Sequence, residues 1–236
     1  METPLPEFAK TMLAMGNKTN VKDIIIKRID ATSANAFIRA NHYSGKVVPN
    51  SQLHFGAFLN NRLHGVMSFG PSTMKRLMIG LVFGTKWNEF IELNRMAFDN
   101  YLPKNSESRS IAIALRLIKK FCPQIKWVLS FADGCQCGDG TIYRASGFVL
   151  TQIKKNIGLR IDEEGNVYSR VSITAHKPNE IKSFYAMKAL DGYQLRYIYF
   201  IDRESLKNLT VPIIPFEKIK EIGAAMYKGK KICGTN

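Results

Sequence analysis

Apolar positions between Phe90 and Phe148 change their spacing several times, and each change marks a predicted element. Residues 90–98 (FIELNRMAF) and 125–134 (IKWVLSFADG) contain short apolar runs typical of strands. Residues 103–120 (PKNSESRSIAIALRLIKK) predict a polar loop and a long helix, and residues 140–148 (GTIYRASGF) predict a short helix before another strand. Each strand leads into a helix N-terminus, where free backbone N–H groups bind anions. We therefore expect this segment to form the base of any active site that the protein has.

The upstream pattern predicts a strand, a helix and a hairpin. The β-branched run over residues 21–29 is typical of a strand, and Thr32 or Ser33 can cap a helix that continues to about Ala40. Two strand-like runs follow at residues 52–59 and 62–69. Asn60 and Asn61 join them, and asparagine tolerates the positive φ of a tight hairpin turn.

The downstream pattern predicts a second hairpin and further elements. The turn residues EEGN lie between two strand-like segments, VLTQIKK and VYSRVSI. A helix-like IKSFYAMKAL and a strand, QLRYIYFI, come after them. The order β-α-β-β-β-α-β-α-β, with extra elements at the end, predicts one mixed α/β (α+β) domain. We place it at residues 21–202, between a lead-in at 1–20 and a C-terminal extension at 203–236.

The charge of the chain indicates a polyanionic partner. Among 236 residues, 34 Lys+Arg stand against 19 Asp+Glu, a formal net charge of +15 that is spread along the chain. A hydrophobic content of 45% is enough for a folded core, so the positive charge belongs to a folded body. This favours nucleic acid as the partner. A protein that is basic without such a partner, or that meets a membrane surface, is the alternative.

The cysteine pattern and the hydropathy indicate the cellular compartment of the protein. Cys122, Cys135, Cys137 and Cys233 form no regular framework, and CxC is not a zinc motif. No apolar run reaches the length of a membrane span, and the N-terminus lacks an apolar signal-peptide core. We therefore expect a cytoplasmic protein without a structural zinc site.

Polar residues at two loops are candidates for chemistry. His42, Tyr43 and Ser44 follow the first predicted helix, and an imidazole there can move protons or bind a metal. A turn whose rings simply pack is an equally good interpretation. Asp133 ends an apolar strand, where it could act as a base or bind a metal with His42, or merely cap the next turn.

Two more candidates flank the long helix. Tyr143 lies on the predicted short helix, where its phenol could donate a proton or simply pack. The loop before the long helix offers hydroxyls and cations suited to a pyrophosphate. Ser106 or Ser108 would serve as the helix cap in any case. The loop lacks the glycine spacing of a Walker or Rossmann motif.

These motifs occur in an order that resembles a known family. The segments NHYSG, QLHFGAFL, ELNRMAF, PKNSESR, SFADG, GDGTIYRASGF and GYQLRYIYFID together resemble the Mom family of phage DNA adenine-modification proteins. The resemblance spans roughly Ile25 to Asp202 and implies a GCN5-related N-acetyltransferase-like fold. In that fold a splayed pair of central strands admits acyl-CoA, whose pyrophosphate meets the start of the central helix.

The resemblance also implies an activity. A phage-encoded enzyme of this family adds a carbamoylmethyl (acetamido) group to the N6 amine of adenine in DNA and so protects phage DNA from restriction. It would act in the cytoplasm of the host on double-stranded DNA, with the adenine flipped from the duplex. The donor is expected to be acetyl-CoA or a related acyl donor. An ordinary N-acetyltransferase, or a DNA-binding protein without catalysis on the same fold, is the alternative.

The resemblance gives each candidate residue an expected role. The reacting centre is expected to contain His42, Tyr43, Ser44, Asp133 and Tyr143. The acyl-CoA phosphates are expected to meet Arg95, Lys104, Asn105, Ser106, Glu107, Ser108 and Arg109. Five residues are candidates for contacts to the DNA backbone on the basis of their charge alone: Lys46, Lys154, Lys155, Arg160 and Arg170. The C-terminal strand QLRYIYFI could complete a partner's sheet, which would make the protein a homodimer.

Overall fold

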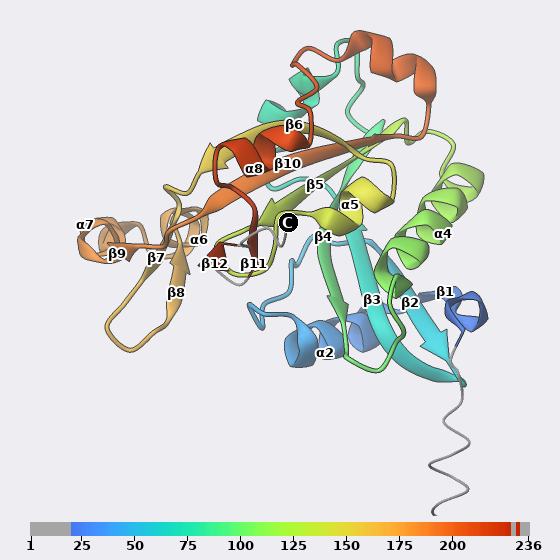
Figure 1. Ribbon diagram of the computed structural model, residues 1–236, viewed down its shortest axis with the longest axis horizontal. Helices are drawn as coiled ribbons and strands as arrows, with labels where there is room; N and C mark the ends of the chain where they lie inside the picture. The colour runs from blue at the N-terminus through green and yellow to red at the C-terminus, as the bar shows by residue number, and fades with distance from the viewer. Residues whose placement is uncertain (1–19, 228–229, 232–236) are drawn as a thin grey trace, which may run out of the picture.

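A seven-stranded sheet forms the centre of the computed structural model, which describes residues 20–227 and 230–231 (Figure 1). The strand order is β1-β2-β3-β4-β5-β10-β6, and every neighbouring pair is antiparallel except β4 and β5. The strands are β1 Ile25–Ile29, β2 Leu53–Leu59, β3 Arg62–Gly70, β4 Phe90–Phe98, β5 Trp127–Asp133, β6 Val149–Lys155 and β10 Tyr193–Phe200. The predicted mixed α/β fold is therefore confirmed.

Helices cover both faces of this sheet (Figure 1). The α-helices are α2 Ala31–Asn41, α3 Lys75–Met78, α4 Ser106–Phe121, α5 Thr141–Ala145, α6 Arg170–His176, α7 Ile181–Ala186 and α8 Glu217–Glu221. Short 3-10 turns are Val21–Asp23, Ile79–Leu81, Pro178–Glu180 and Arg203–Asn208. Ile38 of α2 packs with Val66, whereas Ile111 of α4 packs with Met67. Because neighbouring residues of a strand point to opposite faces, α2 and α4 lie on opposite sides of the sheet.

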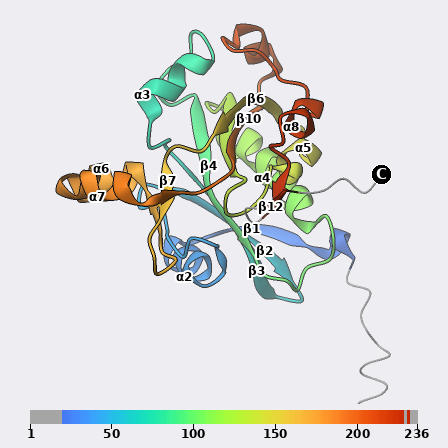
Figure 2. The ribbon, with the colours of Figure 1, turned by 60° about the vertical axis from the view of Figure 1, so that its left-hand side comes forward.

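A small sheet with two helices projects from the body between β6 and β10 (Figure 2). Its strands are β7 Leu159–Ile161, β8 Val167–Ser169 and β9 Lys188–Ala189, and α6 and α7 connect β8 to β9. A two-stranded ribbon of β11 Met226–Tyr227 and β12 Lys230–Lys231 lies near the C-terminal end. The α8 region packs into the main core through Ile219, Ala224 and Ala225.

The first predicted hairpin is present, and so is the second predicted turn, but the strand before that turn is β7 and not VLTQIKK, which is β6 and pairs with β10. Asn60 and Asn61 have φ of 50° and 61° and join β2 to β3, as their tolerance of positive φ predicts. In the second hairpin Gly165 has φ of 89°, and β7 pairs with β8 around it.

Four further predictions about elements need correction. The N-cap of α2 is Asp30, which accepts the Ser33 N–H at 2.8 Å, and not Thr32 or Ser33. The predicted strand at 21–29 begins with a 3-10 turn. The predicted strand VYSRVSI ends at Ser169, after which the chain turns into α6. The strand QLRYIYFI is β10, which pairs with β5 and β6 of its own sheet and cannot complete a partner's. The predicted 1–20 lead-in and Cys233 fall outside the described residues, apart from Asn20.

The parallel strands β4 and β5 separate soon after they begin. Only Phe90, Ile91 and Glu92 pair with β5, opposite Trp127, Val128 and Leu129. Beyond that point β4 pairs on one side only, with β3, and β5 on one side only, with β10. The sheet therefore opens into a fork toward the C-terminal ends of both strands, which is the splayed pair that the resemblance implies.

Gly140 sets the start of α5, and its replacement is the first testable prediction. Its φ is 84°, and a Cβ there would lie 2.4 Å from a ring carbon of Tyr197. Strain and overlap together lead us to expect Gly140→Ala to lower the free energy of unfolding by about 2–4 kcal/mol. Urea unfolding measures this. Gly158→Ala is the control, because no atom lies within 4 Å of its added Cβ. Equal stability of both variants would contradict the prediction.

Candidate active site at the strand fork

Side chains from three separate segments come together at the open end of the fork. His42 and Tyr43 directly follow α2, Asp133 ends β5, and Tyr143 lies on α5. Tyr43 is 49% exposed. Burial raises the pKa of Tyr43, and the charges of Asp133 and Cys137 raise it further. The structure thus brings the predicted reacting groups into one electrostatic cluster.

His42 is held by Ser44 in one tautomer. The Ser44 backbone N–H donates to His42 Nδ1 at 3.1 Å, and the Ser44 Oγ lies 2.8 Å from the same atom. A nitrogen that accepts a backbone N–H carries no proton, so the neutral ring holds its proton on Nε2. Burial, followed by the charge of Arg95, lowers the pKa of His42 to about 4. His42 is therefore neutral near pH 7 and suited to donate a hydrogen bond from Nε2.

This depressed pKa makes stability depend on pH. The unfolded imidazole titrates near 6.5 and the folded one near 4, so between these values the unfolded chain binds more protons. We expect His42 to lower the free energy of unfolding as pH falls from 6.5 to 4, by up to about 3 kcal/mol. Comparing urea unfolding of wild type and His42→Gln at pH 7 and pH 4.5 tests this. If the two proteins lost the same stability on acidification, His42 would not be the group responsible.

Asp133 is fixed by the turn that follows β5. Its Oδ1 accepts the Cys135 N–H at 3.0 Å, and its Oδ2 accepts the Gln136 side-chain amide at 2.9 Å. Asp133 therefore caps the turn after β5, which is the alternative role that the sequence offered for it. Its carboxylate is partly exposed, and its charge raises the pKa of Tyr43 and of the Cys135 thiol. Asp133 is therefore held rigidly and still faces the cluster.

Tyr143 is enclosed by aromatic rings. It is buried, and its ring centre lies 5.4 Å from that of Phe148 and 5.3 Å from that of Tyr197. Burial raises the pKa of Tyr143 to about 12, while the Ser130 hydroxyl favours the ionised form. The phenol therefore stays protonated in the neutral pH range and can serve as a donor.

Sequence reasoning missed Glu92 and Cys137 as members of this site. Glu92 is the last β4 residue paired with β5, and its Oε2 is buried without a hydrogen bond. Burial raises the pKa of Glu92, against the side chains of Ser72 and Asn94. Its charge acts on Tyr143, as does that of Cys137. The signal in the sequence was a glutamate inside the apolar run FIELN.

Arg95 lies beside the reacting centre. Its Nε donates to the Lys46 carbonyl at 2.9 Å and its Nη1 to the Asn94 carbonyl at 2.8 Å. Its charge lowers the pKa of His42 and opposes the rise of the Tyr43 pKa. The guanidinium thus joins β4 to the loop after α2. Its contact with acyl-CoA phosphates stays a prediction.

The loop before α4 forms an uncapped helix N-terminus. Asn105 takes the left-handed conformation, with φ of 71°, and makes no side-chain cap. The hydroxyls of Ser106 and Ser108 donate to the carbonyls of Pro103 and Asn105, so the predicted serine cap is wrong. The Ser106 N–H donates to the Pro103 carbonyl at 3.2 Å, which leaves the N–H groups of Glu107 and Ser108 for another acceptor.

Charged residues on this loop differ in their surroundings. Lys104 is exposed, and Glu107 adds a carboxylate to the first turn of α4. Arg109 donates from Nη2 to the Lys22 carbonyl at 3.3 Å, and its buried Nε has no hydrogen bond. The buried Nε donor suits an anionic ligand, whereas Glu107 opposes one.

Four of the five predicted DNA contacts are exposed: Lys46, Lys154, Lys155 and Arg170. Arg160 differs because it binds within the projecting unit. Its Nη1 donates to the Tyr185 and Met187 carbonyls at 3.0 and 2.6 Å, and its guanidinium lies over the Phe184 ring. Arg160 therefore holds α7 against β7, which leaves it less free to meet a phosphate.

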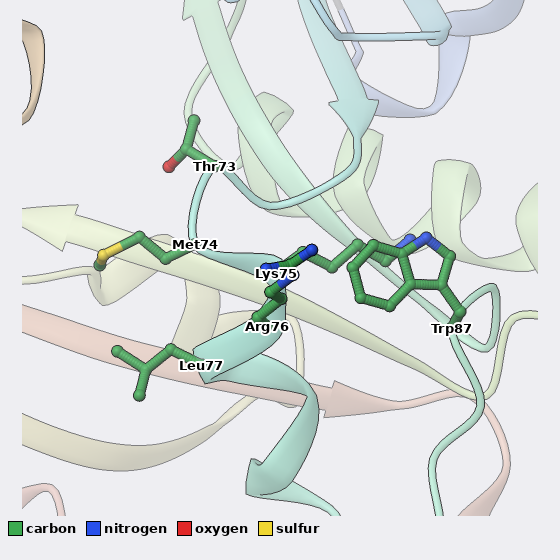
Figure 3. A pocket seen from close by; sticks show the side chains of 6 residues that line it. All are labelled: Thr73, Met74, Lys75, Arg76, Leu77 and Trp87. Atoms are coloured by element: carbon green, nitrogen blue, oxygen red, sulfur yellow. The ribbon is translucent and has the colours of Figure 1, made fainter. Parts of the chain in front are cut away.

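A surface hollow lies away from this cluster. This hollow has a volume of about 410 Å³ and is lined by Thr73, Met74, Lys75, Arg76, Leu77 and Trp87 (Figure 3). Lys75 Nζ lies 4.7 Å from the Trp87 ring centre. A second hollow of about 530 Å³ also includes Lys75 and Trp87. None of the predicted catalytic residues lines either hollow.

Within residues 20–227 and 230–231, no three His, Cys, Asp or Glu side chains are grouped to hold a metal ion. The suggested pairing of His42 with Asp133 stays a prediction. Over the same part of the chain, none of the helices has the length and apolar character to cross a membrane.

Comparisons with known proteins place the chain in one family. Residues 23–218 match the model of the Mom protein family. The methylcarbamoylase Mom of Escherichia phage Mu is 31% identical over 199 residues, which is 81% of each chain. The chain therefore belongs to the Mom family, as its motifs indicate.

Solved acetyltransferase structures are also similar in part. An acetyltransferase from Bacillus cereus is 11% identical, with a TM-score of 0.45, over 75% of this chain and 99% of its own. A spermidine/spermine N-acetyltransferase from Vibrio cholerae is 9% identical, with a TM-score of 0.45, over 79% and 98%.

Proposed function

We propose that this protein transfers a carbamoylmethyl group to the N6 amine of adenine in phage DNA and so protects that DNA from restriction. The observation that carries the proposal is the cluster of His42, Tyr43, Asp133 and Tyr143 at the fork of β4 and β5. It occurs in a member of the Mom family with a relative named methylcarbamoylase. The net charge of +15 supports DNA as the substrate.

An acyl-CoA donor fits the residues at the start of α4. The uncapped N–H groups of this helix and the buried Arg109 Nε are donors suited to a pyrophosphate. Lys104 adds a cation beside them, and Glu107 adds an opposing charge. Bound there, the donor would supply the two-carbon unit.

The residues of the cluster have complementary roles in this proposal. The donor in this proposal is a two-carbon acyl-CoA that carries a leaving group X on its methylene carbon. The adenine amine forms one N–C bond to that carbon and loses one proton, while the C–X bond breaks and X departs with its electron pair. Ammonia then displaces the CoA thiol from the carbonyl carbon and so completes the carbamoyl group. Asp133 accepts the amine proton. Tyr143, which remains protonated, donates a proton to the leaving group. His42 donates a hydrogen bond from Nε2 to a carbonyl oxygen.

The chemistry requires more than direct attack on a thioester, which would give an N-acetyl product. The new bond is to a methylene carbon, and the adenine amine is a weak nucleophile because its lone pair is delocalised into the ring. The fork therefore has to activate the methylene carbon and exclude water.

Nucleoside mass spectrometry tests the proposal. DNA from cells that express the chain is digested to nucleosides and compared with DNA from cells that express Asp133→Asn. We expect a deoxyadenosine that carries the mass of one carbamoylmethyl group in the first sample alone. Unmodified adenine in both samples would refute the proposed enzyme, and an acetyl adduct would replace it with an ordinary acetyltransferase.

A further inference from the structure

Phe131 is an exposed aromatic residue in the middle of the central sheet. It lies in β5, where Val128 and Leu129 are fully buried, yet 39% of its own surface is exposed. It belongs to none of the three apolar clusters that form the core of the described residues. A large apolar side chain in this position does not serve the packing of the core.

The register of the sheet places Phe131 on the same face as Asp133. Ser130 and Ala132 point to the Tyr143 side, where Ala132 packs with Tyr143 in the core. Phe131 and Asp133 alternate with them and so point to the opposite face, so that Asp133 and Tyr143 border the open fork from opposite faces of the sheet. Two residues of a strand span about 7 Å, which is on the scale of a purine. A base lying on Phe131 would thus place one edge near Asp133.

Toward the C-terminal end of β5, the neighbours of Phe131 on this face are polar or positively charged. Arg196 of β10 pairs with Phe131, and Gln194 pairs with Asp133. One strand further, Lys154 of β6 pairs with Gln194. Arg196 is buried and donates to the Thr151 side chain and carbonyl at 3.0 and 3.3 Å, neither of which is charged. On the other side of Phe131 the paired part of β4 has ended, so the fork begins there.

We infer that Phe131 is the stacking platform for the adenine extruded from DNA, and that Asp133 meets the N6 edge of the stacked base. The inference rests on the proposed function and names the part of the site that holds the substrate. Every base has a π-face, and aromatic stacking contributes about 1–3 kcal/mol per base. The positive charge of Arg196 and Lys154 favours the approach of the negatively charged strand that carries the base.

Equilibrium binding tests this without any turnover. Two duplexes are compared, one with an unpaired adenine at its centre and one with an abasic site in its place. We expect the wild-type protein to prefer the adenine, and Phe131→Leu to lower that preference about 10-fold. Phe131→Trp should retain it. Phe121→Leu is the matched control, because Phe121 is 68% exposed at the end of α4.

The outcomes separate this inference from the proposed function. Thermal unfolding first checks that each variant is folded. An undiminished preference in Phe131→Leu, or the same loss in Phe121→Leu, would overturn the inference even if DNA is modified. A loss confined to Phe131→Leu would support it even if the nucleoside product is not carbamoylmethyl adenine. A rise in KM for DNA in Phe131→Leu, with a smaller change in kcat, would agree with a platform.

Discussion

Replacement of Asp133 by asparagine is expected to reduce the rate of adenine modification by about 100-fold or more, because it removes the proposed proton acceptor. The substitution keeps the shape of the side chain. An asparagine carbonyl can still accept the Cys135 N–H, and the Gln136 amide can turn to accept from the new amide group. The turn after β5 should therefore survive. The rate of adduct formation in purified DNA measures the effect.

Asp162 provides the control for this substitution. It is also a turn aspartate, whose Oδ1 accepts the Asn166 N–H at 2.7 Å and whose Oδ2 accepts the Asn166 side-chain amide at 3.0 Å. It lies in the hairpin of the projecting unit, outside the fork. Asp162→Asn should retain full activity. If Asp133→Asn retained it as well, Asp133 would be a turn residue alone and the proposed mechanism would be wrong.

The elements that could be predicted from the sequence are those set by local chemistry. Paired asparagines define the β2–β3 turn because both must take positive φ. The buried face of α2, with Ala34 and Ile38, follows from helical spacing. The loop-to-helix junctions at Asn105 and Gly140 follow from the change of pattern between strand and helix.

The features that escaped prediction depend on distant parts of the chain. Arg160 seemed a surface cation, but the carbonyls that it binds lie 25 and 27 residues away. The segment that forms β10 seemed free for a partner, yet it enters the sheet between β5 and β6. Glu92 and Phe131 become candidate site residues only because β4 separates from β5. No local sequence pattern predicts that separation.

Replacement of Tyr143 by phenylalanine is expected to lower the rate by about 100-fold, because it removes the proposed proton donor and leaves the ring in place. With a pKa of about 12, the phenol is protonated throughout the neutral range. The wild-type rate should therefore show no loss from Tyr143 ionisation as the pH rises from 7 to 9. The loss in Tyr143→Phe should be the same across that interval. Initial rates of adduct formation at several pH values measure both.

Tyr197 separates a catalytic phenol from a structural one. Its ring centre lies 5.3 Å from that of Tyr143, and its hydroxyl donates to the Asp139 carbonyl at 2.5 Å. Tyr197→Phe should therefore cost about 1 kcal/mol of unfolding free energy and leave the rate nearly unchanged. Tyr143→Phe should instead lower the rate strongly and the free energy of unfolding little, because the reaction depends on the proton of its phenol. Full activity in Tyr143→Phe, or equal losses of rate in both variants, would mean that Tyr143 supports the core and takes no part in proton transfer.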